Sequence, residues 1–232
     1  MLFDLDGTLA DTESMWQEAY RRLAAAHGVE PAPGWWSRIV GRDLGDAAVI
    51  LLETTADTTA RRDELVSHLV DEAITLLRSG ATAAPDQGGI AVPWRPGAQR
   101  LLTALTRSGV PTAVVTATPR RLLDVVVDHL DIDVDLTLAG DEVARGKPDP
   151  EGYLRAAALL GVDIATAVVV EDSPTGVAAA EASGARVLVV PHAVPVADAA
   201  TRTVVSSLEE VSIDRLASLP RQPHRTDHDP QD

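Results

Sequence analysis

The sequence predicts an α/β fold, a doubly wound, Rossmann-like parallel sheet with an inserted α-helical cap domain. Two features of the chain indicate this class. From residue 97 onward, short apolar runs alternate with helical patterns, which is typical of strand–helix–strand units with right-handed crossovers. Between the first apolar run and residue 97 the apolar spacing is helical, so we expect a helical insert after the first strand.

Five short apolar or β-branched runs predict buried strands. They are Met1–Leu5, Thr112–Thr116, Val134–Leu138, Ala167–Glu171 and Arg186–Pro191. Helices are expected to connect the later strands, and Asp149-Pro150 and Ser173-Pro174 are typical helix starts. The predicted helical ranges are 97–108, 119–130, 149–161 and 174–183.

The insert is expected to hold three helices, over residues 13–27, 43–54 and 59–79, the first of them capped by Thr12. Residues 80–93 are rich in Gly, Ala and Pro and are expected to form the linker back to the sheet. The predicted organisation is an α/β core of residues 1–12 and 94–205, a cap with its linker at 13–93, a C-terminal helix at 206–218 and a disordered tail at 219–232.

The chain of 232 residues is acidic, with 20 Lys and Arg against 35 Asp and Glu and a net charge of −15. This charge repels nucleic acid and anionic membrane surfaces, so we expect neither as a partner. No window is apolar enough for a membrane span and the first residues lack a signal-peptide pattern, so we expect a cytoplasmic protein. The chain contains no cysteine, which excludes disulfides, thiolate nucleophiles and cysteine-ligated metals.

Two aspartates directly follow the first predicted strand, in Asp4-Leu5-Asp6-Gly7-Thr8. A turn at Gly7 would direct both carboxylates toward the loop side of the sheet, where open α/β sheets bind ligands. Two acids this close repel each other, and a hard divalent cation would offset the repulsion. A simple Asp-Gly turn explains the same residues equally well. Only three residues precede Asp4, so either the strand is short or the true start lies upstream.

Three further groups lie at or after the ends of later predicted strands. Thr116-Ala117 offers a hydroxyl and backbone N–H groups suited to a phosphate oxygen. Glu171-Asp172 adds two acids in the same layer. Between them in the chain lies Lys147, the only lysine among the 20 cationic side chains. Lysine supplies a compact point charge, which the planar arginine group does not. Each group alone has an ordinary structural explanation, but together they describe one site.

These motifs, in this order, resemble those of the haloacid dehalogenase superfamily, in its branch of capped phosphatases and β-phosphoglucomutase-like enzymes. The resemblance implies a Mg²⁺-dependent phosphatase that hydrolyses a small phosphorylated metabolite of the sugar phosphate class, and we expect a monomer. It spans residues 1 to about 205 and rests on Asp4-Leu5-Asp6-Gly7-Thr8, Val115-Thr116, Gly146-Lys147-Pro148-Asp149-Pro150 and Val170-Glu171-Asp172-Ser173-Pro174-Thr175-Gly176.

The resemblance also implies a role for each matching residue. Asp4 would be the nucleophile that forms an aspartyl-phosphate. Asp6 would protonate the leaving alcohol and then activate water for hydrolysis. Thr116, Ala117 and Lys147 would bind the transferring phosphoryl group, whose negative charge needs positioning and neutralisation.

In the same way, the resemblance implies a Mg²⁺ site made by the Asp4 carboxylate, the Asp6 backbone carbonyl and Asp172, with Glu171 in or beside that shell. The second acid and the metal ligands argue against a dehalogenase, which needs neither. A phosphonatase-like enzyme would need a cap lysine for a Schiff base, whereas Lys147 belongs to the core motif.

Two alternatives stay open. A sugar phosphomutase resembling β-phosphoglucomutase would carry a histidine on the first cap helix where this chain has Trp16, and a cap lysine that this chain lacks. Both differences favour a phosphatase without excluding a mutase. A non-catalytic binding protein on the same fold is less favoured, because the acids of the motifs are intact.

Within the cap, Gly41-Arg42 resembles the family segment that faces the active site, so Arg42 is a candidate contact for a sugar hydroxyl or a second anionic group. A helix-capping arginine is an equal alternative. Trp16 is expected to serve packing. His224 and His228 lie four residues apart in the predicted tail, where they reflect composition rather than a metal site.

Overall fold

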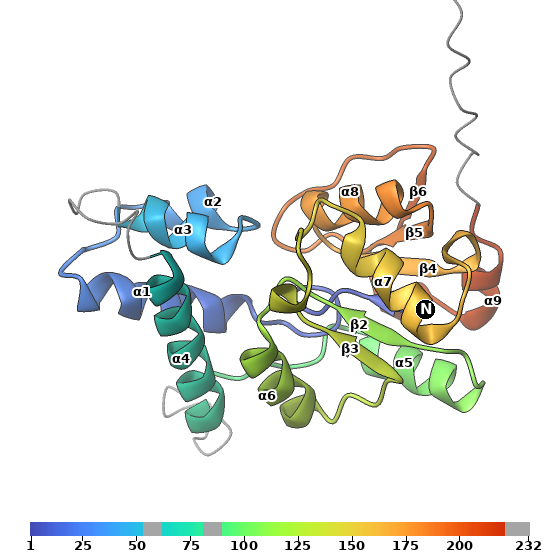
Figure 1. Cartoon of the computed structure of the whole chain (residues 1–232), viewed down its shortest axis with the longest axis horizontal. Helices are drawn as coiled ribbons and strands as arrows, with labels where there is room; N and C mark the ends of the chain where they lie inside the picture. Colours follow the sequence, from blue (N-terminus) through green and yellow to red (C-terminus); the bar gives the residue numbers. More distant parts are fainter. Residues whose placement is uncertain (53–61, 81–89, 221–232) are drawn as a thin grey trace, which may run out of the picture.

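The computed structural model describes residues 1–52, 62–80 and 90–220. At its centre is a six-stranded parallel sheet in the order β3-β2-β1-β4-β5-β6 (Figure 1). The chain runs from β1 toward one edge through β2 and β3, and then returns to the other side of β1 for β4, which is the doubly wound arrangement. The strands are β1 Leu2–Phe3, β2 Ala113–Val115, β3 Leu136–Leu138, β4 Val168–Glu171, β5 Arg186–Val189 and β6 Arg202–Val204.

Apolar side chains on both faces explain why such short strands form the centre of the molecule. Successive strand residues point to opposite faces, so Leu2 and Val169 pack on one side of the sheet and Phe3 and Val170 on the other. All four side chains are fully buried. A strand that is covered on both faces has a continuous apolar sequence, which is the pattern that predicted these strands.

Helices cover each face of the sheet. Helices α7 (Glu151–Leu160) and α8 (Pro174–Ser183) pack on the face that holds Leu2. The other face is covered by α5 (Ala98–Arg107), α6 (Arg120–Leu130) and α9 (Ile213–Ala217). The predicted ranges for α5 to α8 agree with these bounds within two residues at each end. Ser173 caps α8 by accepting a hydrogen bond from the Gly176 N–H, as predicted.

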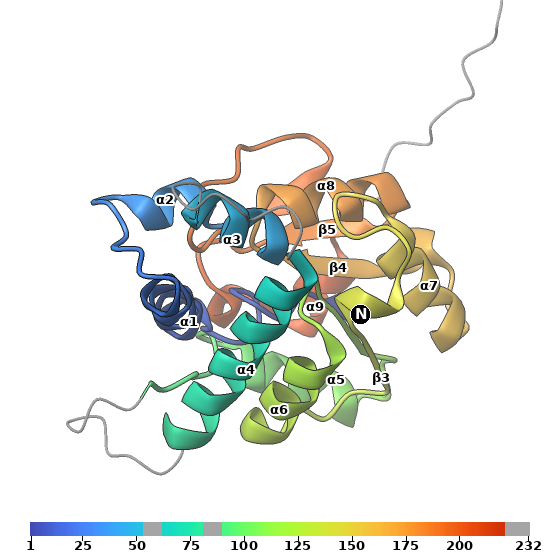
Figure 2. The same ribbon diagram turned by 60° about the vertical axis from the view of Figure 1, so that its left-hand side comes forward.

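In the described part of the chain five helices lie between β1 and β2, and the first four of them, those of the insert, gather on one side of the sheet (Figures 1 and 2). In both views α4 lies beside α6, which it contacts. Leu69 of α4 is fully buried in the same apolar cluster as Leu122 of α6, so the insert shares a core with the sheet-covering helices. The helices of the insert are α1 Glu13–Ala26, α2 Trp35–Ile39, α3 Leu44–Leu51 and α4 Arg62–Gly80.

None of the helices in the described part of the chain is long and apolar enough to cross a membrane.

The C-terminal part differs from the sequence prediction. Strand β6 was not predicted; it pairs with β5 at the sheet edge, where its three residues are only half-buried. The single helix expected over 206–218 is wrong, since a 3₁₀ turn at Leu208–Glu210 and the short α9 take its place. The side chains of Ser207 and Ser212 each accept a nearby backbone N–H and so start separate turns. Leu219 is buried, so the described chain still packs where the tail was expected to begin.

The insert also departs from the prediction in three places. Thr12 precedes α1 but does not cap it, because its hydroxyl donates to Asp6 instead. Helix α2 is only five residues long and was not predicted. Gly80 belongs to α4 and not to the linker. Parts of the predicted insert, linker and tail, namely residues 53–61, 81–89 and 221–232, lie outside the described residues.

Leu69→Ala is expected to destabilise the protein, because it opens a cavity in the cluster that joins the insert to the helices on the sheet. Such buried Leu→Ala changes cost about 2–5 kcal/mol of unfolding free energy. Leu159→Ala is the matched control, since Leu159 of α7 is 59% exposed and such surface changes stay within about 0.5 kcal/mol. Urea unfolding measures both variants, and equal free energies of unfolding would contradict the shared core.

Candidate active site

Residues that follow three adjacent strands meet at the carboxyl ends of those strands. Asp4 follows β1, Thr116 follows β2, and Asp172 follows β4, with β1 between the other two strands. Lys147 lies in the segment between β3 and α7. At this point the direction of the connections reverses, which is where open α/β sheets bind ligands. The strand order therefore brings together residues that are far apart in the sequence.

Lys147 forms ion pairs with two buried acids. Its Nζ lies 2.6 Å from Asp4 Oδ1 and 2.7 Å from Glu171 Oε1, and its side chain is only 12% exposed. The ammonium group also lies 5.1 Å from the centroid of the Tyr153 ring. Two carboxylates, which accept hydrogen bonds from the ammonium group, and an aromatic face thus surround its compact charge.

Glu171 is completely buried and is held by donors on both oxygens. Besides the lysine, Oε1 accepts from the Tyr153 hydroxyl at 2.5 Å. Oε2 accepts from the Asp172 backbone N–H at 3.2 Å and from the Ser173 hydroxyl at 3.3 Å. The carboxylate packs against Gly176 in the first turn of α8, where a Cβ would lie 1.9 Å from Oε1. Only glycine at this position leaves room for the buried acid.

Asp6 accepts four side-chain hydrogen bonds. Oδ1 accepts from the Thr12 hydroxyl at 2.7 Å and from the Trp16 indole at 3.0 Å. Oδ2 accepts from the Thr116 hydroxyl at 3.1 Å and from the Thr118 hydroxyl at 2.6 Å. The first pair of donors belongs to the start of the insert and the second pair follows β2, so this carboxylate lies between the insert and the sheet edge.

Gly7 makes the turn that follows the two aspartates. Its φ of +83° lies in the left-handed region that favours glycine, as the predicted turn requires. A Cβ at this position would lie 2.2 Å from Asp172 Oδ2. The turn therefore lets the first loop approach the acid that follows β4.

Burial governs the charge of the acids. Desolvation raises the pKa of Asp4 to about 7, against the attraction of Lys147, and repulsion from Glu171 adds to the rise. Burial also raises the pKa of Asp172 well above its ordinary value, with repulsion from Asp4 contributing. For Lys147, burial lowers the pKa, but the attraction of Asp4 and Glu171 outweighs it and the pKa is raised. The lysine therefore stays charged, but its single positive charge does not offset all the negative charge of the neighbouring acids.

Asp4, Glu171 and Asp172 form a donor set that fits a divalent metal. Each offers one carboxylate oxygen, and these oxygens lie within 4.8 Å of one another. Hard oxygen ligands are those that Mg²⁺ prefers. The raised pKa values of Asp4 and Asp172 indicate that positive charge near these acids is insufficient. A divalent cation would also supply that charge.

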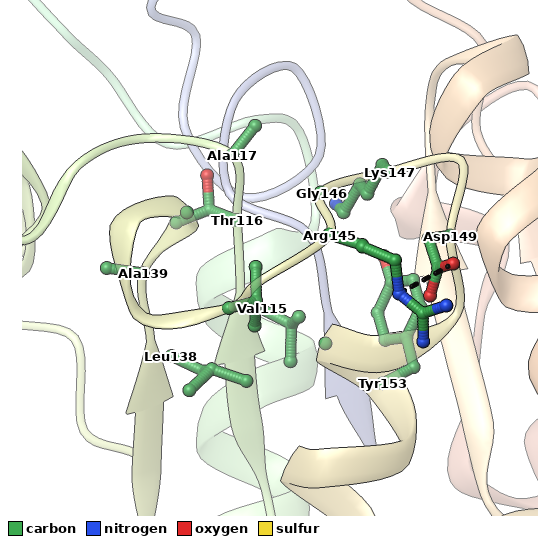
Figure 3. Close-up of a pocket in the computed structure, with 13 residues that line it drawn as sticks. Val115, Thr116, Ala117, Leu138, Ala139, Arg145, Gly146, Lys147, Asp149 and Tyr153 are labelled. Atoms are coloured by element: carbon green, nitrogen blue, oxygen red, sulfur yellow. Dashed lines mark ion pairs between the residues drawn. The ribbon is translucent and has the colours of Figure 1, made fainter.

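A small recess lies beside Lys147 and is lined by residues from the ends of β2 and β3, from the segment before α7 and from the first turn of α7 (Figure 3). Thr116, Ala117 and Lys147, the three residues expected to bind phosphate, all line it. Its volume of about 20 Å³ admits about one water-sized group. At its rim Arg145 pairs with Asp149, with 3.3 Å between Nε and Oδ2. The recess therefore suits a single oxygen of a larger group bound outside it.

The candidate cap contacts lie on the surface. Gly41 and Arg42 are both exposed. The Arg42 Nε donates to the backbone carbonyl of Arg38 at 2.8 Å, which is the helix-capping alternative for this arginine. His224 and His228 lie outside the described residues.

Three contacts to the acids did not follow from the sequence. Thr118 donates to Asp6, and only its two-residue spacing from another strand-end threonine gave any signal. Tyr153 donates to Glu171, but this contact depends on how α7 packs on the sheet. Trp16 was expected to serve packing alone, and its indole N–H donates to Asp6.

The fold and the candidate site together define a class, an α/β protein of the Rossmann-like type whose candidate active site lies at the carboxyl ends of parallel strands. Comparison with protein families gives the particular member of that class. The family model of haloacid dehalogenase-like hydrolases matches residues 1–184, and the chain belongs to this family.

Known relatives agree with this assignment. The chain is 35% identical over 185 residues to the validoxylamine A 7'-phosphate phosphatase of Streptomyces hygroscopicus subsp. limoneus, covering 79% of this chain and 81% of that protein. It is 31% identical to a phosphorylated carbohydrates phosphatase of Thermotoga maritima, with 79% and 81% covered. The crystal structure of CbbY from Rhodobacter sphaeroides in complex with phosphate superposes with a TM-score of 0.76 at 26% identity, covering 90% of this chain and 94% of the other.

The raised pKa of Asp4 gives a prediction about stability without divalent metal. Because the folded-state pKa of about 7 exceeds the ordinary value of 3.8, this group costs stability as pH rises through that interval. Asp4→Asn removes the charge and is expected to stabilise the protein by on the order of 1–2 kcal/mol at about pH 8, with a smaller gain at about pH 5.

Urea unfolding in EDTA at both pH values measures this difference. Asp124→Asn is the matched control, since the side chain of Asp124 is 60% exposed, and it is expected to change neither value. A less stable Asp4→Asn protein at the higher pH would mean that the ionised Asp4 is net stabilising.

Proposed function

We propose that this protein is a Mg²⁺-dependent phosphatase that hydrolyses a small phosphorylated metabolite, of the sugar phosphate class, through an aspartyl-phosphate. The observation that carries the proposal is the contact of Lys147 with Asp4, at 2.6 Å, beside the cluster that Asp4 forms with Glu171 and Asp172. A buried acid next to a fixed cation and a metal donor set suits phosphoryl transfer, which depends on positioning and charge neutralisation.

In the first step a carboxylate oxygen of Asp4 attacks phosphorus, and the bond between phosphorus and the alcohol oxygen breaks. Asp6 gives its proton to the departing oxygen. Thr116, the backbone of Ala117 and Lys147 bind the phosphoryl oxygens. The product of this step is the free alcohol and phosphorylated Asp4.

In the second step Asp6 takes a proton from water, whose oxygen attacks the phosphorus on Asp4. The bond between phosphorus and the Asp4 oxygen breaks, so inorganic phosphate leaves and the carboxylate is restored. Asp6 is then protonated again and ready for the next substrate.

The residues proposed to hold Mg²⁺ are Asp4, Asp172, Glu171 and, through its backbone carbonyl, Asp6. When bound, the ion would neutralise charge on the phosphoryl group. The fit of the carboxylate donors and the raised pKa values of Asp4 and Asp172 support this choice.

The substrate class follows from the relatives, since two of them are named as phosphatases of phosphorylated carbohydrates or of validoxylamine A 7'-phosphate. Gly41 and Arg42 are proposed as cap contacts for the non-reacting part of the substrate. Trp16 in place of the expected mutase histidine favours hydrolysis over a sugar phosphomutase. Release of inorganic phosphate separates the two activities, because a mutase keeps phosphate on the sugar.

The test is a phosphate-release assay with Mg²⁺ on glucose 6-phosphate, sorbitol 6-phosphate, glycerol 3-phosphate and p-nitrophenyl phosphate. The wild-type protein is expected to release phosphate from p-nitrophenyl phosphate and at least one of the others, and EDTA is expected to stop release. Asp4→Asn is expected to lower the rate by on the order of 10⁴-fold or more, because no nucleophile remains.

Asp124→Asn, the same chemical change on the surface of α6, is expected to keep the wild-type rate. Substantial turnover by Asp4→Asn would overturn the assignment of the nucleophile. Isomerised sugar phosphate without free phosphate would indicate the mutase instead.

A further inference from the structure

The two oxygens of Asp6 are held by donors of different kinds. Hydroxyl groups can donate or accept a hydrogen bond, whereas an indole N–H can only donate. Three of the four side-chain contacts to this carboxyl group come from hydroxyls, and the fourth comes from Trp16, with 3.0 Å between Nε1 and Oδ1. The Trp16 contact therefore requires Oδ1 to be an acceptor, whereas both side-chain partners of Oδ2 are hydroxyls that can accept as well as donate.

Trp16 is itself firmly placed. It is 8% exposed, and its ring lies 6.3 Å from that of Tyr20, centroid to centroid. Tyr20 in turn donates to the Leu44 carbonyl at 3.2 Å, so it links α1 to α3. The backbone N–H of Trp16 donates to the Thr12 carbonyl at 3.0 Å. Packing and backbone bonds thus keep the indole N–H directed at Asp6.

We propose that Trp16 is a positioning residue for Asp6, which holds Oδ1 through its indole N–H and leaves Oδ2 to exchange the proton with the leaving oxygen and with water. The inference rests on the proposed function, in which Asp6 is the acid and base. It gives the first helix of the insert a part in the reaction beyond packing.

The effect of losing the Trp16 contact depends on the substrate. An alkyl alcohol is a poor leaving group and needs a proton as it departs, whereas p-nitrophenolate leaves without one. Misplacing the acid should therefore slow the first step for a sugar or polyol phosphate far more than for p-nitrophenyl phosphate. The ratio kcat/KM reports this first step, because alcohol release is irreversible at initial rates.

The test measures kcat/KM of Trp16→Phe for p-nitrophenyl phosphate and for the sugar or polyol phosphate of the assay above that is hydrolysed fastest. Phenylalanine keeps an aromatic ring and removes the N–H. We expect kcat/KM for the alkyl substrate to fall about tenfold or more and that for the aryl substrate to fall less than about threefold. If Trp16→Phe does not fold, Trp16→Leu, which also removes the N–H, is measured in its place.

Trp36→Phe is the matched control. Its indole N–H donates to Glu13 Oε1 at 2.9 Å, and its ring lies 6.2 Å from Tyr20, so it belongs to the same aromatic group without reaching Asp6. This variant is expected to keep the wild-type ratio of kcat/KM for the alkyl substrate to kcat/KM for the aryl substrate. A change that merely loosened the insert would lower both rates together, in either variant.

An unchanged ratio in Trp16→Phe, with wild-type activity intact, would overturn this inference and leave the proposed function standing. An equal fall for both substrates would also overturn it, since it would assign Trp16 a structural role. If the wild-type protein releases phosphate from no substrate, the proposed function fails and the inference fails with it.

Discussion

The ion pairs of Lys147 with Asp4 and Glu171 join the residues at the centre of the site. Both acids are buried, at 6% and 0% exposure, and burying a carboxylate without a partner costs folding free energy. The lysine supplies one compact charge that pairs with both carboxylates and offsets part of their negative charge. The parallel sheet provides the geometry, since its strand order places Asp4 and Glu171 on neighbouring strands with the lysine-bearing segment above them.

Holding these buried acids together lowers the folding stability of the protein. The raised pKa values of Asp4 and Asp172 mean that their ionised forms are unfavourable in the folded protein without further positive charge. Asp172 and Glu171 lie close to the backbone of Gly7 and Gly176, where any side chain larger than hydrogen would collide with them. The apolar layers on both faces of the sheet and the core shared with the insert offset this cost. A metal ion that binds the folded state would offset it further.

The sequence predicted the central strands and the helices on the sheet, because strands that are buried on both faces have continuous apolar runs. It also predicted Asp4, Lys147 and Asp172 as site residues, because their motifs, taken together and in this order, resemble those of a known enzyme family. It did not predict β6, whose half-buried edge residues lack that pattern. The contacts of Tyr153 and Trp16 depend on how α7 and α1 pack at the sheet edge, and no local spacing encodes such packing.

The proposed phosphatase activity requires a compact point charge at residue 147, and the exchange Lys147→Arg measures this requirement. Arginine keeps the charge but brings a larger planar group into a space that Asp4, Glu171 and Tyr153 enclose around one nitrogen. We predict that kcat/KM for phosphate release falls on the order of 100-fold or more while the circular dichroism spectrum is unchanged. Arg21→Lys, the reverse exchange at a side chain of α1 that is 57% exposed, should keep the wild-type rate. A Lys147→Arg protein with near-wild-type activity would contradict the account.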